Sequence, residues 1–284
     1  MKKNILIYGS GNIGMRHAQS LIGQKDIKNI YMFDISLLSI DNAKNFFKNN
    51  KHKNKLVFTN SIKMVENENF FLCIICTYAY DRIKTLKTVK KNIKIKFIIC
   101  EKILDTNIAN FRYLNFNNKN VYVNFPLREM KVFKIIKEKL KSKKINAKIS
   151  GNWHMLCNTL HYVNFVSYLT NSKIKMLKIK DLHSKYNLSR KNCIDYHGEI
   201  NTEFNNNSKL KILSIDKSKK FNFELSNKKQ KINLDLNYNH LTIDKKKFYC
   251  KKEYQSNLTK NYFLSLSRTG KLNLPKFNDV IKEN

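Results

Sequence analysis

The sequence has no long hydrophobic run. Its 284 residues include no stretch of about 18 apolar residues, so we expect no membrane-spanning helix. A short apolar stretch follows two N-terminal lysines, but Gly9, Gly11 and the pair Arg16-His17 interrupt it, so we expect no export signal. Hydrophobic residues still make up 42% of the chain, which predicts one large or two ordinary globular domains rather than a disordered protein.

Acidic residues and arginine are scarce. The chain carries 55 Lys and Arg against 21 Asp and Glu, a formal net charge of +34. Such a charge is typical of proteins that bind nucleic acid or an anionic membrane surface. However, lysine lacks the planar fork with which arginine grips phosphates, and the basic residues are spread along the chain. We attribute the charge to composition bias and expect no nucleic-acid or membrane partner, with a surface that attracts an acidic substrate, partner or polyanion as the alternative.

A repeated metal-ligand pattern is also missing. Of six cysteines, only Cys73 and Cys76 form a C-x-x-C pair, which would raise zinc or redox chemistry, and no second pair follows. Both lie in residues 70–77, an apolar run that predicts a buried strand, where residues three apart point to opposite faces. We therefore expect buried free thiols, no metal site and a reducing cytoplasmic location.

Proline is nearly absent, and Pro126 and Pro275 fall near segment boundaries. The first 125 residues alternate apolar strands with amphipathic helices, which predicts a parallel sheet covered on both sides, a Rossmann domain. After Pro126 the pattern changes to helices followed by period-two segments from Lys209 onward, an antiparallel meander. We predict strands at 4–9, 29–35, 55–59, 70–77, 95–102, 121–126, 209–216, 221–226, 231–237 and 240–244, and helices at 12–24, 36–50, 81–91, 128–142, 151–171 and 252–267. The fold class is α/β: a Rossmann domain over 1–125 and an α+β domain with a mostly antiparallel, open-faced sheet over 126–284, with the active site between them.

A glycine-rich stretch, GSGNIG, follows the first predicted strand and opens the first predicted helix. In that context, Gly9 permits a tight turn, Gly11 lets the backbone approach a pyrophosphate, and Gly14 allows the helix to pack closely. The N–H groups of the helix start, at Asn12 and Ile13, would face the phosphates. The alternative is a purely structural cluster of turn glycines.

An acidic residue ends the second predicted strand, about 20 residues after the glycines, as the dinucleotide fingerprint requires. Asp34 would accept hydrogen bonds from ribose hydroxyls and repel a 2′-phosphate, and neither Ile35 nor Ser36 offers a cation. The cofactor we predict is therefore NAD, with NADP disfavoured. The alternative is a surface aspartate at a strand end.

Several stretches together resemble the Gfo/Idh/MocA oxidoreductases. The opening IYGSGNIGMRHAQSL resembles the family's glycine motif with its Arg-His pair, and ICEKIL resembles its Glu-Lys-Pro motif, with Ile103 in place of proline. The segments that resemble further family motifs are ICTYAYDRI, VNFPLRE, GNWHMLCNTLHYVNFVSYL and LPKFNDVI. The resemblance is good from 1 to about 170, thinner through the meander, and returns at the end.

The resemblance implies two catalytic residues. Lys102, at the carboxyl end of a central strand beside Glu101, matches the lysine that contacts substrate and assists proton transfer, and Glu101 lies beside the cofactor. His161, on the helix over 151–171, matches the acid/base that takes the hydroxyl proton. The alternatives are a surface lysine and a satisfied core histidine.

Cys157 and Asn164 depart from the family, since many members carry aspartate at these two positions. The first loss leaves the charged form of His161 less stabilised, and Asn158 would orient the substrate instead. The form Cys-Asn-x-x-His-Tyr resembles a subgroup of surface-polysaccharide and unusual-sugar pathways, which favours a sugar or sugar-nucleotide substrate.

Four further residues are candidates for binding. Thr77 and Tyr78 would face the cofactor or cap a helix. Arg128 would contact an anionic substrate or lie solvated at a helix start. Trp153 would stack on a sugar or nicotinamide ring, or pack in the core.

The sequence therefore predicts an NAD-dependent dehydrogenase of a sugar or sugar nucleotide, a homo-oligomer through its open sheet face. The alternatives are a catalytically inactive NAD-binding regulator or scaffold, and a polyanion binder.

Overall fold

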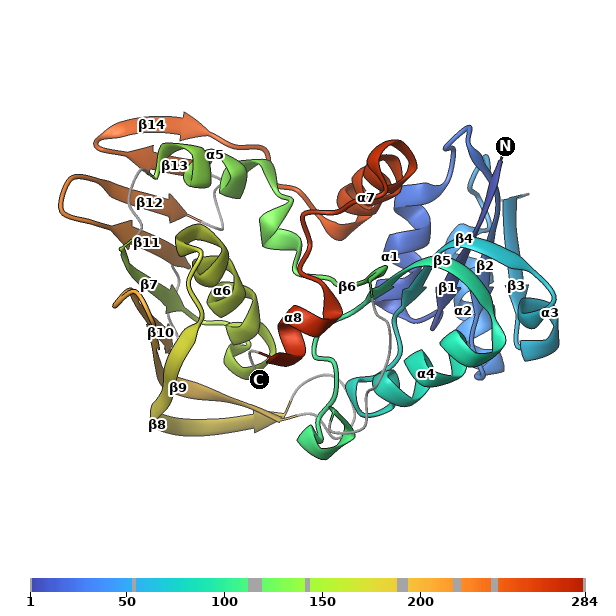
Figure 1. The fold of residues 1–284 in the computed structure, drawn as a ribbon, viewed down its shortest axis with the longest axis horizontal. Helices are drawn as coiled ribbons and strands as arrows, with labels where there is room; N and C mark the ends of the chain where they lie inside the picture. Colours follow the sequence, from blue (N-terminus) through green and yellow to red (C-terminus); the bar gives the residue numbers. More distant parts are fainter. Residues whose placement is uncertain are drawn as a thin grey trace. The chain divides into compact units, whose positions relative to one another are not determined.

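A computed structural model describes residues 2–52, 55–111, 119–140, 144–187, 194–216, 221–235 and 240–282. The chain forms two compact units (Figure 1). The first unit contains Met1–Pro126 and Tyr254–Lys282, and the second contains Leu127–Glu253. The sequence pattern assigns 126–284 to one domain, whereas in the structure the last helices return to the first unit.

The first unit is built on a six-stranded parallel sheet in the order β3-β2-β1-β4-β5-β6. The α/β class predicted from the sequence is confirmed, since this is the strand order of the doubly wound dinucleotide-binding fold. Consecutive residues of the central strands are fully buried, so both faces of the sheet are covered. The strands are β1 (Lys3–Tyr8), β2 (Ile27–Phe33), β3 (Leu56–Thr59), β4 (Asn69–Ile75), β5 (Lys94–Cys100) and β6 (Val121–Val123).

Six α-helices and one short 3₁₀ helix complete the described part of the first unit. The C-terminal segment belongs to this unit, because α7 packs on α1 and Lys276 forms an isolated antiparallel β-bridge with Tyr122 of β6. The helices are α1 (Asn12–Leu21), α2 (Leu37–Phe47), α3 (Ile62–Glu66), α4 (Ala79–Asn92), the 3₁₀ helix Ile108–Phe111, α7 (Gln255–Thr269) and α8 (Phe277–Lys282).

The second unit is an eight-stranded sheet, mostly antiparallel, in the order β14-β13-β12-β11-β7-β10-β9-β8. Helix α6 (Met155–Thr170) covers one face, and its apolar side forms a core with alternate residues of the strands. A 3₁₀ helix, Pro126–Arg128, leads into α5 (Lys131–Lys139). The strands are β7 (Asn146–Gly151), β8 (Ile174–Asn187), β9 (Ile194–Phe204), β10 (Lys209–Ser214), β11 (Asn222–Ser226), β12 (Lys231–Asp235), β13 (His240–Ile243) and β14 (Lys246–Tyr249).

The sheet differs from the predicted meander in two respects. Strand β7 lies between β10 and β11 and runs parallel to β10. Strands β10 and β11, which the sequence predicts as neighbours in the meander, are therefore separated by β7. Strands β7, β8, β9 and β14 are additional to the predicted ones, and the helix predicted over 151–171 begins only at Met155, because Gly151 still belongs to β7. The open face of the sheet carries Lys148, Lys211 and Glu203 beside a shallow hollow of about 600 Å³.

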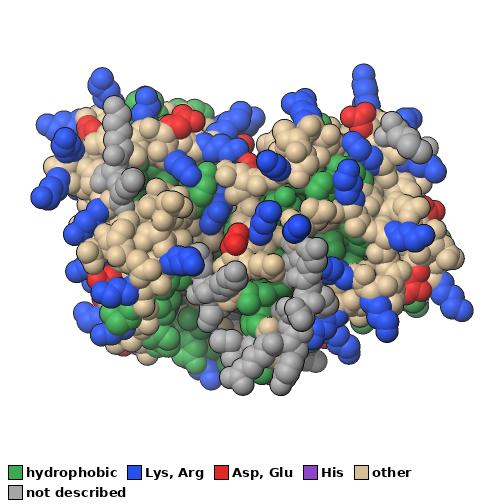
Figure 2. Space-filling view, in the orientation of Figure 1, with side chains coloured by type: hydrophobic (Ala, Val, Ile, Leu, Met, Phe, Trp, Pro, Cys, Tyr) green, Lys and Arg blue, Asp and Glu red, His purple; other side chains and the backbone are tan. Residues whose placement is uncertain are grey.

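The lysines are distributed rather than gathered. On the face that Figure 2 shows, Lys and Arg side chains project from most of the visible surface, with Asp and Glu between them at a few places. Within the described part of the chain, no helix combines the length and the apolar character that crossing a membrane requires.

Candidate functional site

The carboxyl ends of four parallel strands, β1, β2, β4 and β5, bring the predicted residues of the first unit to one edge of its sheet. Backbone hydrogen bonds continue past the strands: the Gly9 N–H donates to the Phe33 carbonyl at 2.8 Å, and the Glu101 N–H to the Ile75 carbonyl at 3.0 Å. The Asn124 N–H likewise donates to the Cys100 carbonyl at 2.8 Å. This edge is where open α/β sheets bind ligands.

The three glycines of the loop have three different environments. Gly9 has a φ of +103°, and a Cβ there would lie 2.9 Å from the Cys76 carbonyl carbon. A Cβ on Gly14 would lie 2.0 Å from the Gly9 carbonyl oxygen, so α1 can approach the loop only through a glycine. Gly11 is different, because it has a φ of −67° and, apart from its two chain neighbours, no described residue lies within 4 Å of a Cβ built on it. Neither backbone strain nor packing therefore explains the glycine at position 11.

Helix α1 begins directly behind this open space. Gly11 is its N-cap, and among the described residues no side chain caps it. Asn12, Ile13 and Gly14 form its first turn, which carries no acidic residue. Free N–H groups and the helix dipole favour an anion here, and the glycine at position 11 leaves space for one. The residues present fit the pyrophosphate of a dinucleotide.

Asp34 follows β2 and is held beside the glycine loop. Its Oδ2 accepts the Ser10 N–H at 2.8 Å and its Oδ1 accepts the Ser36 N–H at 2.9 Å. A carboxylate has about four acceptor positions, so Asp34 can still accept hydroxyl donors. Among the residues after it, Ile35, Leu37 and Leu38 are apolar and exposed to solvent, Ile35 to 83% and Leu38 to 71%.

Thr77 and Tyr78 follow β4. A Cβ on Gly9 would lie 3.1 Å from the Thr77 N, so Thr77 is a direct neighbour of the glycine loop. Tyr78 is the N-cap residue of α4, and its ring stacks on that of Tyr80 with centroids 5.6 Å apart. Both rings are more than 60% exposed. Tyr78 thus occupies the predicted helix-cap position, and its side chain remains accessible to a ligand.

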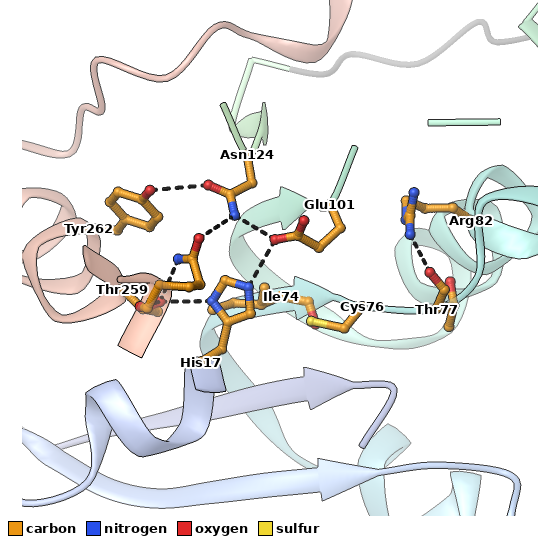
Figure 3. A network of polar contacts seen from close by, with 10 residues as sticks. His17, Ile74, Cys76, Thr77, Arg82, Glu101, Asn124, Thr259 and Tyr262 are labelled. Atoms are coloured by element: carbon orange, nitrogen blue, oxygen red, sulfur yellow. Dashed lines mark hydrogen bonds and ion pairs between the residues drawn. The ribbon is translucent and has the colours of Figure 1, made fainter. Parts of the chain in front are cut away.

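Glu101 belongs to a buried polar network that Figure 3 shows. Its Oε1 is 2.9 Å from His17 Nε2 of α1, and it also accepts from Asn124 Nδ2. His17 is fully buried, and its Nδ1 is 2.7 Å from Thr259 Oγ1 of α7. The Tyr262 hydroxyl donates to Asn124 Oδ1 at 3.1 Å, so the network joins α1, β5, β6 and α7.

The network also sets the charge state of Glu101. Burial alone would raise its pKa, but hydrogen bonds from His17 and Asn124 and the charges of His17 and Arg82 lower the pKa from 4.5 to about 2. Glu101 is therefore an anion throughout the physiological range. Because one of its oxygens is engaged by the protein, its first role is to fix the end of β5.

Arg82 connects two loops at the same edge. It is 5% exposed, and its guanidinium donates to the carbonyl oxygens of Thr77 and Ile103 (Figure 3 draws the Thr77 contact). Lys102 lies between Glu101 and Ile103 and is half-buried, and the Lys102–Ile103 peptide bond is cis. Lys102 thus follows β5 at the same edge as the glycine loop.

In the second unit, α6 carries the predicted acid/base. His161 is half-buried, and Cys157, Asn158 and His154 lie one to two turns before it. Asn158 Nδ2 donates to the His154 carbonyl at 2.9 Å, and His154 Nδ1 is 3.3 Å from the Tyr186 hydroxyl. These polar side chains lie on one partly exposed stripe of an otherwise buried helix.

Asp195 of β9 fixes the start of α6, and sequence reasoning missed it. Its fully buried carboxylate accepts the Leu156 N–H at 2.9 Å and the Cys157 N–H at 3.5 Å. Burial, with the charges of Asp195 and Cys157, raises the pKa of Tyr186 to about 12. A carboxylate therefore does lie beside residue 157, although residue 157 is itself a cysteine.

The remaining two predicted contacts lie elsewhere in the second unit. Arg128 Nε donates to Asn164 Oδ1 of α6 at 2.8 Å, and its guanidinium lies 4.7 Å from the Tyr168 ring centroid. Trp153 is 7% exposed, its indole donates to the Leu213 carbonyl at 3.1 Å, and its ring packs on Tyr162. Trp153 has the packing role, so we remove it from the proposed substrate contacts.

Comparison with known proteins gives a fold. No family model and no curated protein sequence matches the chain. Among solved structures, UDP-N-acetylglucosamine 3-dehydrogenase GnnA from Acidithiobacillus ferrooxidans matches with a TM-score of 0.73 and 9% identity, over 96% of this chain and 91% of that one. The myo-inositol dehydrogenase of Lactobacillus casei, in complex with NAD(H) and myo-inositol, matches with a TM-score of 0.65 and 15% identity, over 82% and 74%. A super-repressor mutant of Gal80p from Saccharomyces cerevisiae matches with a TM-score of 0.69 and 12% identity, over 97% and 87%.

The chain has the Gfo/Idh/MocA oxidoreductase fold. The resemblance predicted from the sequence motifs is confirmed at this level. Solved structures with the Gfo/Idh/MocA fold hold NAD or NADP, and they include both dehydrogenases and a repressor. At identities of 9 to 15%, the fold is what these likenesses show.

Of the first unit's buried polar network, only Glu101 was predicted as a site residue, and the neighbouring Arg82 was not predicted either. His17 was visible as part of the Arg-His pair of the Gfo/Idh/MocA motif, but the sequence does not show that it contacts Glu101. Arg82 had a signal as well, since it is the one arginine in a helix whose other basic residues are lysines. Only the structure shows the physical reason for an arginine there, which is that its guanidinium donates to two backbone carbonyls at once.

Proposed function

We propose that the protein is an NAD-dependent oxidoreductase that transfers hydride between nicotinamide and a hydroxyl or ketone of a sugar or sugar nucleotide. The observation that carries this proposal is the glycine at position 11. Neither its backbone conformation nor its described neighbours require a glycine there, and it leaves space at a helix start that no side chain of the described residues caps. The fold supports it, since dehydrogenases of a sugar nucleotide and of a polyol share it. A role in surface-polysaccharide or unusual-sugar biosynthesis follows from the Cys-Asn-x-x-His-Tyr form.

The glycine loop, Asn12, Ile13 and Asp34 bind the dinucleotide, with Asp34 accepting the ribose hydroxyls. Asp34 is followed by exposed Ile35 and Ser36, and neither offers a cation to pair with a 2′-phosphate. This favours NAD over NADP. Thr77 and Tyr78 border the cofactor next to the glycine loop. Glu101 supports the cofactor site indirectly, because it fixes the end of β5.

Bound NAD supplies a hydride acceptor at nicotinamide C4. His161 takes the proton of the substrate hydroxyl during oxidation and returns it during reduction. Lys102 contacts the substrate oxygen and assists that proton transfer, while Asn158 and Arg128 orient the substrate. Residue 157 is a cysteine where many family members carry aspartate, but the Asp195 carboxylate lies at the start of α6 and provides an acidic group there.

Replacement of the two catalytic residues tests the reaction. Lys102→Ala and His161→Ala should each lower turnover about 10²-fold or more, because each removes a proton-transfer group, while NAD affinity stays unchanged. The matched controls are Lys94→Ala at the other end of β5 and His240→Ala at an exposed position of β13, which should retain full turnover. Unchanged turnover in both catalytic variants would contradict the assignment.

The second candidate is a catalytically inactive NAD-binding regulator or scaffold. It is favoured by the cysteine and asparagine at positions 157 and 164, and by a repressor among proteins of this fold. Micromolar NAD binding with no turnover across a panel of sugars and sugar nucleotides would select it.

We also propose a homo-oligomer that forms through the open face of the second sheet. That face carries side chains of both signs, such as Lys148 and Glu203, which a two-fold interface can pair. Light scattering should give a multiple of 33.7 kDa, and a monomer at all concentrations would contradict it.

A further inference from the structure

Lys102 lies between two residues that are both anchored. On one side, the Glu101 carboxylate is engaged by His17 and Asn124. On the other side, the carbonyl of Ile103 accepts a hydrogen bond from the Arg82 guanidinium. The chain on either side of the lysine is therefore tied to α1, to the end of β6 and to α4, whereas the loop that follows continues to an exposed segment at Thr106 and Asn107.

The Glu101 anchor is rigid because every partner is itself held. His17 is fully buried and contacts Thr259 through its other ring nitrogen at 2.7 Å. Asn124 donates to Gln255 Oε1 at 3.0 Å and accepts from the Tyr262 hydroxyl at 3.1 Å. A buried hydrogen-bond network of this kind restricts the geometry of its members.

The Arg82 anchor joins two loops with one planar group. Its guanidinium donates to the Thr77 carbonyl after β4 and to the Ile103 carbonyl after β5, so it fixes the spacing between the cofactor-facing loop and the Lys102 segment. Lysine has a single ammonium on a flexible stem and cannot present a fork of this kind. In a chain whose basic residues are mostly lysine, this is the chemical reason for an arginine at position 82.

We propose that Arg82 and His17 are positioning residues that together clamp the Lys102 segment against the cofactor-binding edge. This inference rests on the proposed role of Lys102. Neither residue touches the substrate: Arg82 acts through the Ile103 carbonyl and His17 through Glu101. Because a misplacement of about 1 Å can lower a rate about 10²-fold, loss of the clamp should reduce turnover more than it reduces binding.

The first test is a double-mutant cycle. Arg82→Met keeps the apolar stem and removes both donors, and it should lower kcat about tenfold or more with less than about a threefold change in NAD affinity. In the Lys102→Ala background, the same substitution should lower kcat little further, because residues that act as a unit are not additive. An equal loss in both backgrounds would show a general structural role and would overturn the proposal.

Hydrogen exchange of the cofactor-free protein tests the clamp without turnover. Arg82→Met and His17→Asn should each speed exchange in the peptide that contains Lys102 about tenfold or more, with the interior of β5 unchanged. The exposed Arg268→Met on α7 is the charge-loss control and should leave this peptide as in the wild type. Unchanged exchange in both clamp variants would overturn the proposal.

If Arg82→Met does not fold, Arg82→Lys retains the charge and the stem but not the fork, and it should show the same signs with a smaller amplitude. If the wild-type protein neither binds NAD nor turns over a substrate, the proposed function fails by that result, and the exchange experiment alone decides the clamp.

Discussion

At the scale of single residues, the glycine loop separates structural from functional requirements. Gly9 and Gly14 are required by the protein itself, through a positive φ and a backbone contact. Gly11 is required by nothing in the described structure. The three positions therefore offer a test in which folding and ligand binding respond to different glycines.

Gly11→Ala should leave the free energy of unfolding within about 0.5 kcal/mol of the wild type, as an unstrained exposed substitution does. It should weaken NAD binding about tenfold or more, because the methyl group occupies the space of the pyrophosphate. Gly14→Ala should instead destabilise the fold by several kcal/mol, about the cost of a severe overpacking. Denaturant unfolding and calorimetry measure both, and a stable Gly14→Ala or an unaffected affinity in Gly11→Ala would contradict this division.

Glu101 adds a pH dependence to the stability of the fold. Its pKa is about 2 when folded against 4.5 for the free side chain. A depressed carboxylate pKa stabilises the fold fully above pH 4.5, and the contribution is lost as the pH falls through about 2. The difference corresponds to about 3 kcal/mol.

Glu101→Gln should therefore be less stable than the wild type at pH 7, and the gap should shrink steadily between pH 4.5 and pH 2. Urea unfolding across that range measures it. Glu138→Gln, a change of an exposed carboxylate on α5 of the second unit, serves as the control for a simple loss of negative charge. A gap that stays constant with pH would show that Glu101 is not held as a buried anion.

At the scale of elements, all six strands of the first sheet could be predicted, whereas β7, β8, β9 and β14 of the second sheet could not. Strands β1, β4 and β5 are apolar on both faces because helices cover both sides, and this leaves a continuous hydrophobic run. Strand β14 is exposed at all four residues and β8 is an exposed edge strand with three register shifts, so neither carries a regular pattern. Helix α7 buries Leu258, Phe263 and Leu266 and also makes buried polar contacts, but its amphipathic pattern does not show which element it packs against.

The start of α6 depends on one carboxylate from a distant strand. Asp195→Ala removes the acceptor of the Leu156 and Cys157 N–H groups and should destabilise the protein by about 2 kcal/mol, as loss of a strong N-cap does. Asp195→Asn should recover part of this, because an amide oxygen still accepts one N–H. The exposed Asp181→Ala should change stability little, and an equal effect at both positions would contradict a capping role.

At the scale of the whole molecule, the charge of +34 is spread over the visible surface (Figure 2) and does not mark a particular binding site there. Lysines project from most of the visible surface (Figure 2), and no single basic face stands out on that side. The placement of the first unit's candidate residues at strand ends could be predicted from their motifs, whereas the contacts among them depend on which strands are neighbours in the sheet.

A scattered charge predicts weak, sequence-independent binding to DNA. At about 0.15 M salt the Kd should be no tighter than about 1 µM, as for non-specific binding, and should weaken steeply with salt. Fluorescence anisotropy with a labelled duplex and with an acidic polysaccharide measures this. Nanomolar binding at that salt concentration would restore the polyanion hypothesis.

The central claim is that the edge of the first sheet binds NAD. Calorimetric titration of the purified protein with NAD and with NADP, alongside Asp34→Arg, tests it most directly. We predict micromolar binding of NAD, weaker binding of NADP, and a loss of that preference in Asp34→Arg, because the carboxylate is replaced by a cation that accommodates a 2′-phosphate. If the wild-type protein bound neither dinucleotide, the glycine loop would be structural and the oxidoreductase assignment would fall with it.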